Sequence, residues 1–226
     1  MNLKRFLLAL TAVAMLAAVM ANSASATMTA EGQWFNGSGV LLPETGVNCS
    51  KGEGPLVLTG TVGTTPTKLE ATNVECVGAV VKNESSHGVA VGKLNFTGVT
   101  VVEPAGCAVA GGHVETEKLK AELYMSSAST TKAYVKFQPF EAGGLFASFE
   151  ITGSCAAAGP RTVKGSTFGE AANPTKTPAT TQGLNFSTAV EEATESTTTL
   201  KFAGNNAHLS GKANNTLVGG GSFEAH

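Results

Sequence analysis

The chain has 226 residues, with Lys+Arg 15 against Asp+Glu 17 and only 14% charged residues. All of its acidic residues are Glu, because the sequence contains no Asp. Soluble domains usually carry about 25% charged residues. A chain this weakly charged, with no cluster of basic residues, is not expected to bind nucleic acid.

Residues 1–26 have the parts of a secretory signal peptide. Lys4 and Arg5 give a basic start, residues 6–21 are apolar apart from Thr11, and Ala24-Ser25-Ala26 offers the small residues that signal peptidase requires. A permanent membrane anchor is the alternative, but the apolar run is shorter than the ~20 residues of a spanning helix. We therefore expect an exported protein in which residues 27–226 form one β-domain, with no transmembrane segment after cleavage.

Alternation of apolar and polar residues, which is typical of half-buried strands, dominates the rest of the chain. The clearest case is 118–125, where the apolar residues occupy alternate positions; the same stretch is also the one serious helix candidate. A hairpin is expected from 135–138 and 145–152, because two alternating runs flank a Pro- and Gly-containing segment. The other expected strands are 56–61, 74–81, 89–96, 99–102, 161–167, 184–188, 200–202, 207–209 and 217–225, with a turn at 205–206 and a loop at 171–183. Many short strands with Gly-rich turns predict an all-β fold with little helix: an antiparallel two-sheet sandwich, or alternatively a closed β-barrel.

Four cysteines, Cys49, Cys76, Cys107 and Cys155, lie after the signal peptide. An exported protein meets an oxidising compartment, so an even count predicts two disulfides. Metal binding is disfavoured because no two cysteines have the close spacing of a zinc knuckle. We expect Cys49–Cys76 and Cys107–Cys155 because each joins the nearest neighbours in the sequence, although three pairings are possible.

Candidate catalytic or metal-binding residues are few. His113 and Glu115 are two positions apart, so on a strand they share a face and could act as an acid–base or metal-binding pair. Solvated surface groups are the competing interpretation. Glu191, Glu192 and Glu195 could attract calcium, although calcium loops normally use Asp and Asn and a solvated edge is the simpler interpretation. The sequence predicts no cofactor and no defined metal site.

Three stretches resemble uncharacterised secreted β-rich proteins of soil actinobacteria. They are 93–107 with its continuation through 114–116 and Leu119, then 146–155 with 159–160 and 163–166, and finally the Gly-rich 217–223. The resemblance implies an exported β-domain from a Gram-positive-type bacterium. It assigns no activity and no catalytic residue.

The expected protein is therefore a non-catalytic extracellular or cell-envelope protein with a binding or structural role. A cell-envelope polymer or a small ligand is the expected partner, and the sequence sets no oligomeric state. One alternative is a lipocalin-like carrier of a small apolar ligand. The other is a secreted hydrolase that uses Glu and His.

Overall fold

A computed structural model describes residues 28–29, 32–127, 129–194 and 199–226. The predicted signal peptide lies outside the described residues. The described chain is mostly β-strand, with one short helix, α2 (Thr188–Thr194), and one 3-10 turn, η1 (Ala110–Gly112). The all-β prediction with little helix is thus confirmed.

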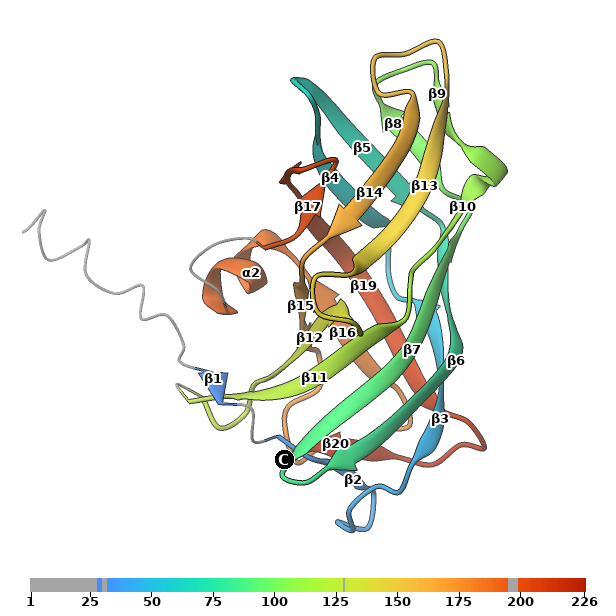
Figure 1. The fold of residues 1–226 in the computed structure, drawn as a ribbon. Coiled ribbons are helices and arrows are strands. Elements are labelled where there is room, and N and C mark those ends of the chain that lie inside the picture. The colour runs from blue at the N-terminus through green and yellow to red at the C-terminus, as the bar shows by residue number, and fades with distance from the viewer. Residues whose placement is uncertain (1–27, 30–31, 128, 195–198) are drawn as a thin grey trace, which may run out of the picture.

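The main sheet closes on itself. Its hydrogen-bonded order runs β16-β15-β12-β11-β7-β6-β3-β19, and β19 pairs in turn with β16, which completes an antiparallel ring (Figure 1). The eight barrel strands are β3 (Thr45–Lys51), β6 (Asn73–Glu84), β7 (His87–Thr97), β11 (Leu119–Ser126), β12 (Ala133–Pro139), β15 (Thr167–Ala171), β16 (Gln182–Phe186) and β19 (His208–Leu217). The alternative prediction of a closed barrel therefore describes this sheet, and the preferred prediction of a two-sheet sandwich does not. Closure at β19 leaves the ring without a free strand edge, which is how barrels avoid edge-to-edge aggregation.

The first residues of β19 extend beyond the barrel. His208, Leu209 and Ser210 pair with β4, and the sheet continues through β5 to β8. A separate five-stranded sheet, in the order β18-β17-β14-β13-β9, lies at the same end of the molecule (Figure 1). These strands are β4 (Leu56–Val62), β5 (Thr65–Ala71), β8 (Thr100–Glu103), β9 (Cys107–Val109), β13 (Leu145–Gly153), β14 (Gly159–Lys164), β17 (Lys201–Phe202) and β18 (Asn205–Asn206).

Short strands complete the structure. At the opposite end of the barrel, β2 (Trp34–Asn36) pairs with β20 (Phe223–Ala225), as Figure 1 shows. Two further strands, β1 (Met28–Thr29) and β10 (His113–Glu115), pair with β11 and β7. The β2–β20 pair thus lies at one end of the barrel. The extension formed by β4, β5 and β8 and the separate five-stranded sheet lie at the other end.

Alternating burial explains the barrel wall. In β11, Leu119, Ala121 and Leu123 are buried while Lys120 and Glu122 between them are partly exposed. Successive side chains of a strand point to opposite faces, so the apolar row fills the interior and the polar row meets water. This stretch is a strand, as the alternation predicts, and not a helix.

Several expected strands are correct in place but wrong in partner. The runs 135–138 and 145–152 correspond to β12 and β13, but these do not form the expected hairpin: β12 pairs with β11 and β15, and β13 pairs with β14 and β9. The intervening segment carries the chain from the barrel to the five-stranded sheet. Alternation reports only which face of a strand is buried, so it cannot identify the partner strand.

Glycines divide two expected strands. Residues 161–167 split into β14 and β15 at Gly165, where φ is +88° and an added Cβ would lie 1.9 Å from the carbonyl oxygen of Thr199. Residues 217–225 split in the same way at Gly219, Gly220 and Gly221, all with positive φ. Two smaller expectations are also wrong. The turn after β17 lies at 203–204 and not at 205–206, and α2 begins where the strand over 184–188 was expected to end.

Both disulfides form in the expected pairing. Cys49–Cys76 joins β3 to β6 within the barrel wall, with a Cα–Cα distance of 4.9 Å. Cys107–Cys155 joins β9 to the turn that follows β13, at 5.7 Å. The cross-links therefore stabilise one site in the barrel and one in the five-stranded sheet.

Candidate functional site: an apolar cavity inside the barrel

The barrel interior contains a cavity of about 110 Å³. Every one of the eight barrel strands contributes to its lining, and most of the side chains are aliphatic or aromatic. Several lining positions carry only a methyl group, namely Ala90, Ala121 and Ala213. Small residues facing inward from different strands leave the centre of the barrel unfilled, because a fixed strand spacing does not let the wall collapse around them.

The β2–β20 pair covers one end of this cavity. Trp34, Phe223 and Ala225 all line it, and the rings of Trp34 and Phe223 lie 5.8 Å apart. Asn83 on β6 holds β2 in place: its Oδ1 accepts from the Trp34 backbone N–H at 2.8 Å, and its Nδ2 donates to the Trp34 carbonyl at 2.9 Å. The cap is therefore attached to the barrel wall by hydrogen bonds to its backbone.

A second, smaller cavity of about 70 Å³ lies at the other end. It is lined by apolar side chains of β4 and β5 on one side and of β13 and β14 on the other. Four side chains line both cavities and thus separate them: Leu56, Phe96, Phe146 and Leu209. We call these four residues the partition.

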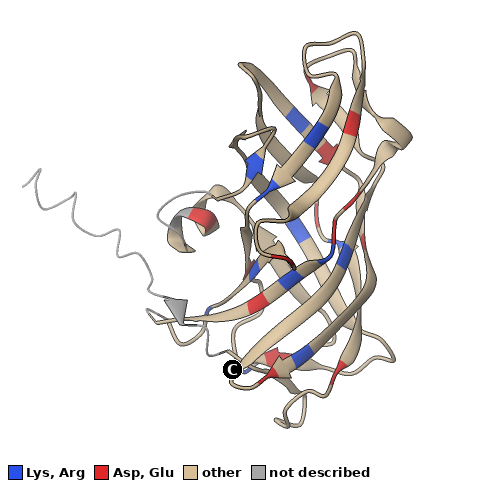
Figure 2. Ribbon diagram, in the orientation of Figure 1, with Lys and Arg blue, Asp and Glu red and all other residues tan. Residues whose placement is uncertain are grey.

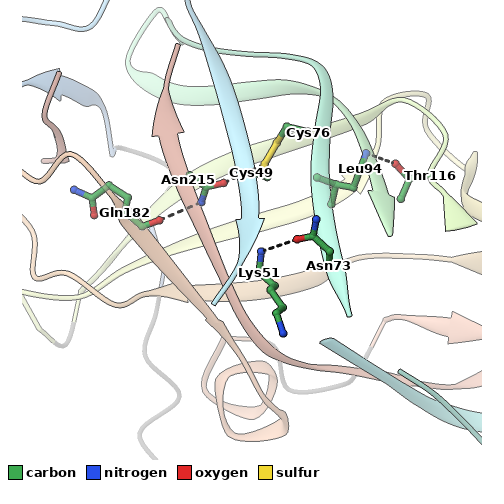
Figure 3. Close-up of a disulfide and its surroundings, with 8 residues drawn as sticks. All are labelled: Cys49, Lys51, Asn73, Cys76, Leu94, Thr116, Gln182 and Asn215. Carbon is green, nitrogen blue, oxygen red and sulfur yellow. Dashed lines mark hydrogen bonds between the residues drawn. A yellow bond between two sulfur atoms is a disulfide. The ribbon is translucent and has the colours of Figure 1, made fainter. Parts of the chain in front are cut away.

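Two amide side chains of the main cavity, those of Asn215 and Gln182, lie near the Cys49–Cys76 disulfide (Figure 3). The Asn215 Nδ2 donates to the Gln182 carbonyl at 3.4 Å, and the Gln182 Nε2 donates to the Phe223 carbonyl at 2.5 Å. The Asn215 Oδ1 lies 3.3 Å from the Cys49 Sγ. Because that sulfur belongs to a disulfide it carries no proton, so this contact does not satisfy the Asn215 oxygen.

The Trp34 indole is the other polar group of interest. Its Nε1 is buried and has no hydrogen-bond acceptor among the described residues. Its Nε1 edge lies over Gly88, where an added Cβ would be 2.7 Å from Nε1. A buried N–H without an acceptor is uncommon and calls for an explanation.

Most charged side chains of the barrel strands are at least partly exposed. Figure 2 shows Lys and Glu at scattered positions along the strands, and some that lie two residues apart on one strand form ion pairs, such as Lys82–Glu84 at 2.9 Å and Lys120–Glu122 at 2.8 Å. Among the described lining residues Lys93 alone is charged, and its Nζ donates to Glu115 at 2.8 Å. This hydrogen bond and the charge of Glu115 raise the pKa of Lys93. The part of the lining that the structure describes is therefore mostly apolar, and its one charged side chain is already paired.

The sequence-predicted pair, His113 and Glu115, lies elsewhere. Both side chains are exposed on β10, on either side of the buried Val114. Glu115 is engaged by Lys93, and the His113 Nδ1 lies 3.2 Å from the Gly111 carbonyl. In the part of the chain that the structure describes, no group of three or more His, Cys or Glu side chains is arranged to hold a metal ion.

Sequence reasoning missed a buried carboxylate. Glu191 on α2, expected at a solvated edge or in a calcium site, is buried and accepts from the Thr167 hydroxyl at 3.1 Å. Its other oxygen lies 2.6 Å from the His208 Nδ1. Val190, next to it, packs on Tyr134 and Phe168 of the barrel. The carboxylate thus helps to hold α2 on the barrel wall; Glu195 lies outside the described residues.

A scan against protein-family models and searches of curated proteins and of solved structures gave no match. Among the described residues, no helix combines the length and the apolar character needed to cross a lipid bilayer.

Proposed function

We propose that this chain is an exported binding protein that holds a small apolar molecule inside its barrel. The observation that carries the proposal is the cavity of about 110 Å³, lined by residues of all eight barrel strands and mostly by apolar side chains. Eight-stranded barrels are just wide enough either to be filled by their side chains or to hold one small ligand. An engineered apolar cavity of roughly 150 Å³ in another protein binds benzene and xenon, so the volume here suits ligands of that scale.

The chemistry of the lining supports binding in preference to catalysis. Among the described lining residues the one charged side chain, Lys93, is paired with Glu115, and the other polar side chains are those of Thr167, Asn173, Gln182, Asn215 and Trp34. Apolar pockets with a few placed polar groups are typical of small-molecule binding sites. Export follows from the signal peptide expected at residues 1–26 and from the resemblance to secreted actinobacterial proteins.

The experiment uses residues 27–226, produced with both disulfides formed. Xenon is titrated into the protein and followed by ¹²⁹Xe NMR, and benzene is titrated in a thermal-unfolding assay. We expect a saturable xenon shift and a benzene-dependent rise in Tm, since a ligand that binds only the folded state stabilises it. Phe140→Ala is the matched control, because Phe140 is exposed and does not line the cavity. Linear, non-saturable responses to both probes would overturn the proposal.

A further inference from the structure

We propose that the small apolar ligand enters and leaves the barrel cavity sideways, between β15 and β16, and that α2 is a lid over this route, held closed by Glu191. The inference rests on the proposed function and concerns how the same cavity is reached. Three observations carry it: the short ladder between β15 and β16, the packing of α2 where that ladder ends, and the firmer closure of both ends of the barrel.

The first observation is a short ladder in the barrel wall. β15 and β16 pair at only two positions, over 170–171 and 184–185. In the described ladders the rest of β15, residues 167–169, pairs with β12, and Phe186 of β16 pairs with β19. We call the stretch between residues 167–169 and Phe186 the seam. Side chains fill it, since a Cβ added to Gly169 would lie 3.0 Å from the Phe186 ring. Widening the seam therefore displaces side chains and leaves the pairing of both strands intact.

One other ladder of the ring is equally short. β3 and β6 pair at only two positions, over 45–46 and 80–81, but the Cys49–Cys76 disulfide joins the same two strands. The remaining ladders of the ring, all within the described residues, have at least four pairs each. Among the described barrel strands the seam is therefore the weakly paired part of the wall that no disulfide crosses.

The second observation is the position of α2, which lies outside the barrel beside β15 (Figure 1). The helix begins two residues after Phe186, and the Ser187 Oγ accepts from the Val190 backbone N–H at 3.2 Å, as the side chain of a helix N-cap does. Val190 is 4% exposed and packs on Tyr134 of β12 and Phe168 of β15. The apolar side of this short helix therefore lies on the barrel wall next to the seam.

Glu191 connects the two sides of the seam. It is 5% exposed, accepts from the Thr167 hydroxyl of β15 at 3.1 Å, and lies 2.6 Å from the Nδ1 of His208 on β19, the strand paired with β16. A buried carboxylate without partners is costly, so these contacts favour the closed position of α2. Thr167 and Phe186 line the cavity, and neither Val190 nor Glu191 does. One layer of side chains thus separates the lid from the ligand.

The third observation is that both ends of the barrel are closed more firmly. At the β2–β20 cap, the Asn83 side chain makes three hydrogen bonds to the backbone in and after β2, at 2.8, 2.9 and 3.2 Å. Backbone hydrogen bonds also tie β20 to the segment 176–179. At the other end the partition separates the main cavity from the second one. Releasing α2 breaks the two contacts of Glu191 and the packing of Val190, whereas releasing the cap breaks many more hydrogen bonds.

The test measures how fast xenon and benzene enter and leave the protein, residues 27–226 with both disulfides formed, by ¹²⁹Xe saturation transfer and by relaxation-dispersion NMR of benzene. Glu191→Gln keeps the shape of the side chain and removes its charge, and Val190→Ala removes two methyl groups. Each variant should raise the entry and exit rates about fivefold or more, the equivalent of ~1 kcal/mol of lost closure. The Kd should stay within about twofold, because neither side chain lines the cavity.

Asn83→Ala is the matched control, since it weakens the cap at the opposite end of the barrel and shows what destabilisation alone does to the rates. Its exchange rates should stay within about twofold of the wild type. Unchanged rates in either lid variant, or an equal acceleration in Asn83→Ala, would overturn the inference and leave the proposed function in place. If Val190→Ala does not fold, Glu191→Gln decides alone. If neither xenon nor benzene binds saturably to the wild type, the proposed function is wrong and the lid falls with it.

Discussion

Filling the cavity should stabilise the protein and abolish binding at the same time. Ala121 is 7% exposed and lines the cavity from β11. Ala121→Leu adds three carbons, each worth about 0.8 kcal/mol when buried, which is offset by ~0.5–1 kcal/mol of lost leucine rotamer entropy. The net expectation is about 1.5 kcal/mol of added stability, or a rise in Tm of roughly 3–6 °C for a domain of this size.

The matched control is the same substitution at a site without space. Ala133 is 0% exposed and does not line the cavity. Ala133→Leu should overpack its site and destabilise by about 1–3 kcal/mol. Urea unfolding gives both free energies, and ¹²⁹Xe NMR gives binding. The reasoning fails if Ala121→Leu destabilises the protein as Ala133→Leu does, or if xenon binds Ala121→Leu as it binds the wild type.

Three further predictions concern the supports of the barrel. Replacing both Cys107 and Cys155 by Ser should lower the free energy of unfolding by about 4 kcal/mol, because the bridge closes a 48-residue separation; a loss under about 1 kcal/mol in urea unfolding would contradict this. Glu191→Ala leaves two hydrogen-bonding groups unpartnered, so it should cost about 1–3 kcal/mol and speed amide hydrogen exchange in α2; unchanged exchange there would argue against the anchoring role. Burial raises the pKa of Glu122, but hydrogen bonding and the charge of Lys120 outweigh it and hold that pKa below its ordinary value. Its contribution to stability is therefore present above the unfolded pKa, about 4.3, and is lost as pH falls through the lower folded value. Glu122→Gln should flatten this acid-side loss in urea midpoints measured from pH 6 downward, and parallel curves would refute the assignment.

Local patterns in the sequence were sufficient for the elements that depend on them. The alternation around Leu119, Ala121 and Leu123 identifies a strand because a half-buried strand requires that period. The nearest-neighbour expectation for the four cysteines matches the structure. Closing a shorter loop costs less chain entropy, which favours such pairings without determining them.

Partners distant in sequence were not predictable in this way. The ring closes because β19 pairs with β16 and β3, and Asn215 faces both Gln182 and Cys49 across these ladders. No local pattern predicts that the strand around residue 213 pairs with the strand around residue 49. The expected hairpin of 135–138 with 145–152 failed for the same reason, since the alternation of each run was real and only the pairing was wrong.

The candidate site could not be found from the sequence because it is a volume inside the barrel that the side chains leave unfilled. A cavity depends on the summed volumes of side chains from all eight strands, and an inward alanine looks the same in a sequence as a well-packed one. Glu191 and His208 were similarly hidden, because their contact brings a helix against the start of β19. The sequence did suggest His113 and Glu115, because residues two positions apart on one strand can be paired from local spacing alone.

The energetics of the empty space connect the fold to the proposed role. At roughly 24 cal/mol per Å³, an unfilled cavity of about 110 Å³ costs on the order of 2.6 kcal/mol, a large share of the stability of a typical domain. One alanine-to-leucine change at Ala90, Ala121 or Ala213 would recover much of that cost. The barrel instead keeps alanine at these three positions. Its eight strands form a closed ring of hydrogen-bonded pairs, and the Cys49–Cys76 disulfide links β3 to β6 in that ring. If the proposed ligand binds only the folded state, it would return the contacts that the empty space lacks and so offset this cost.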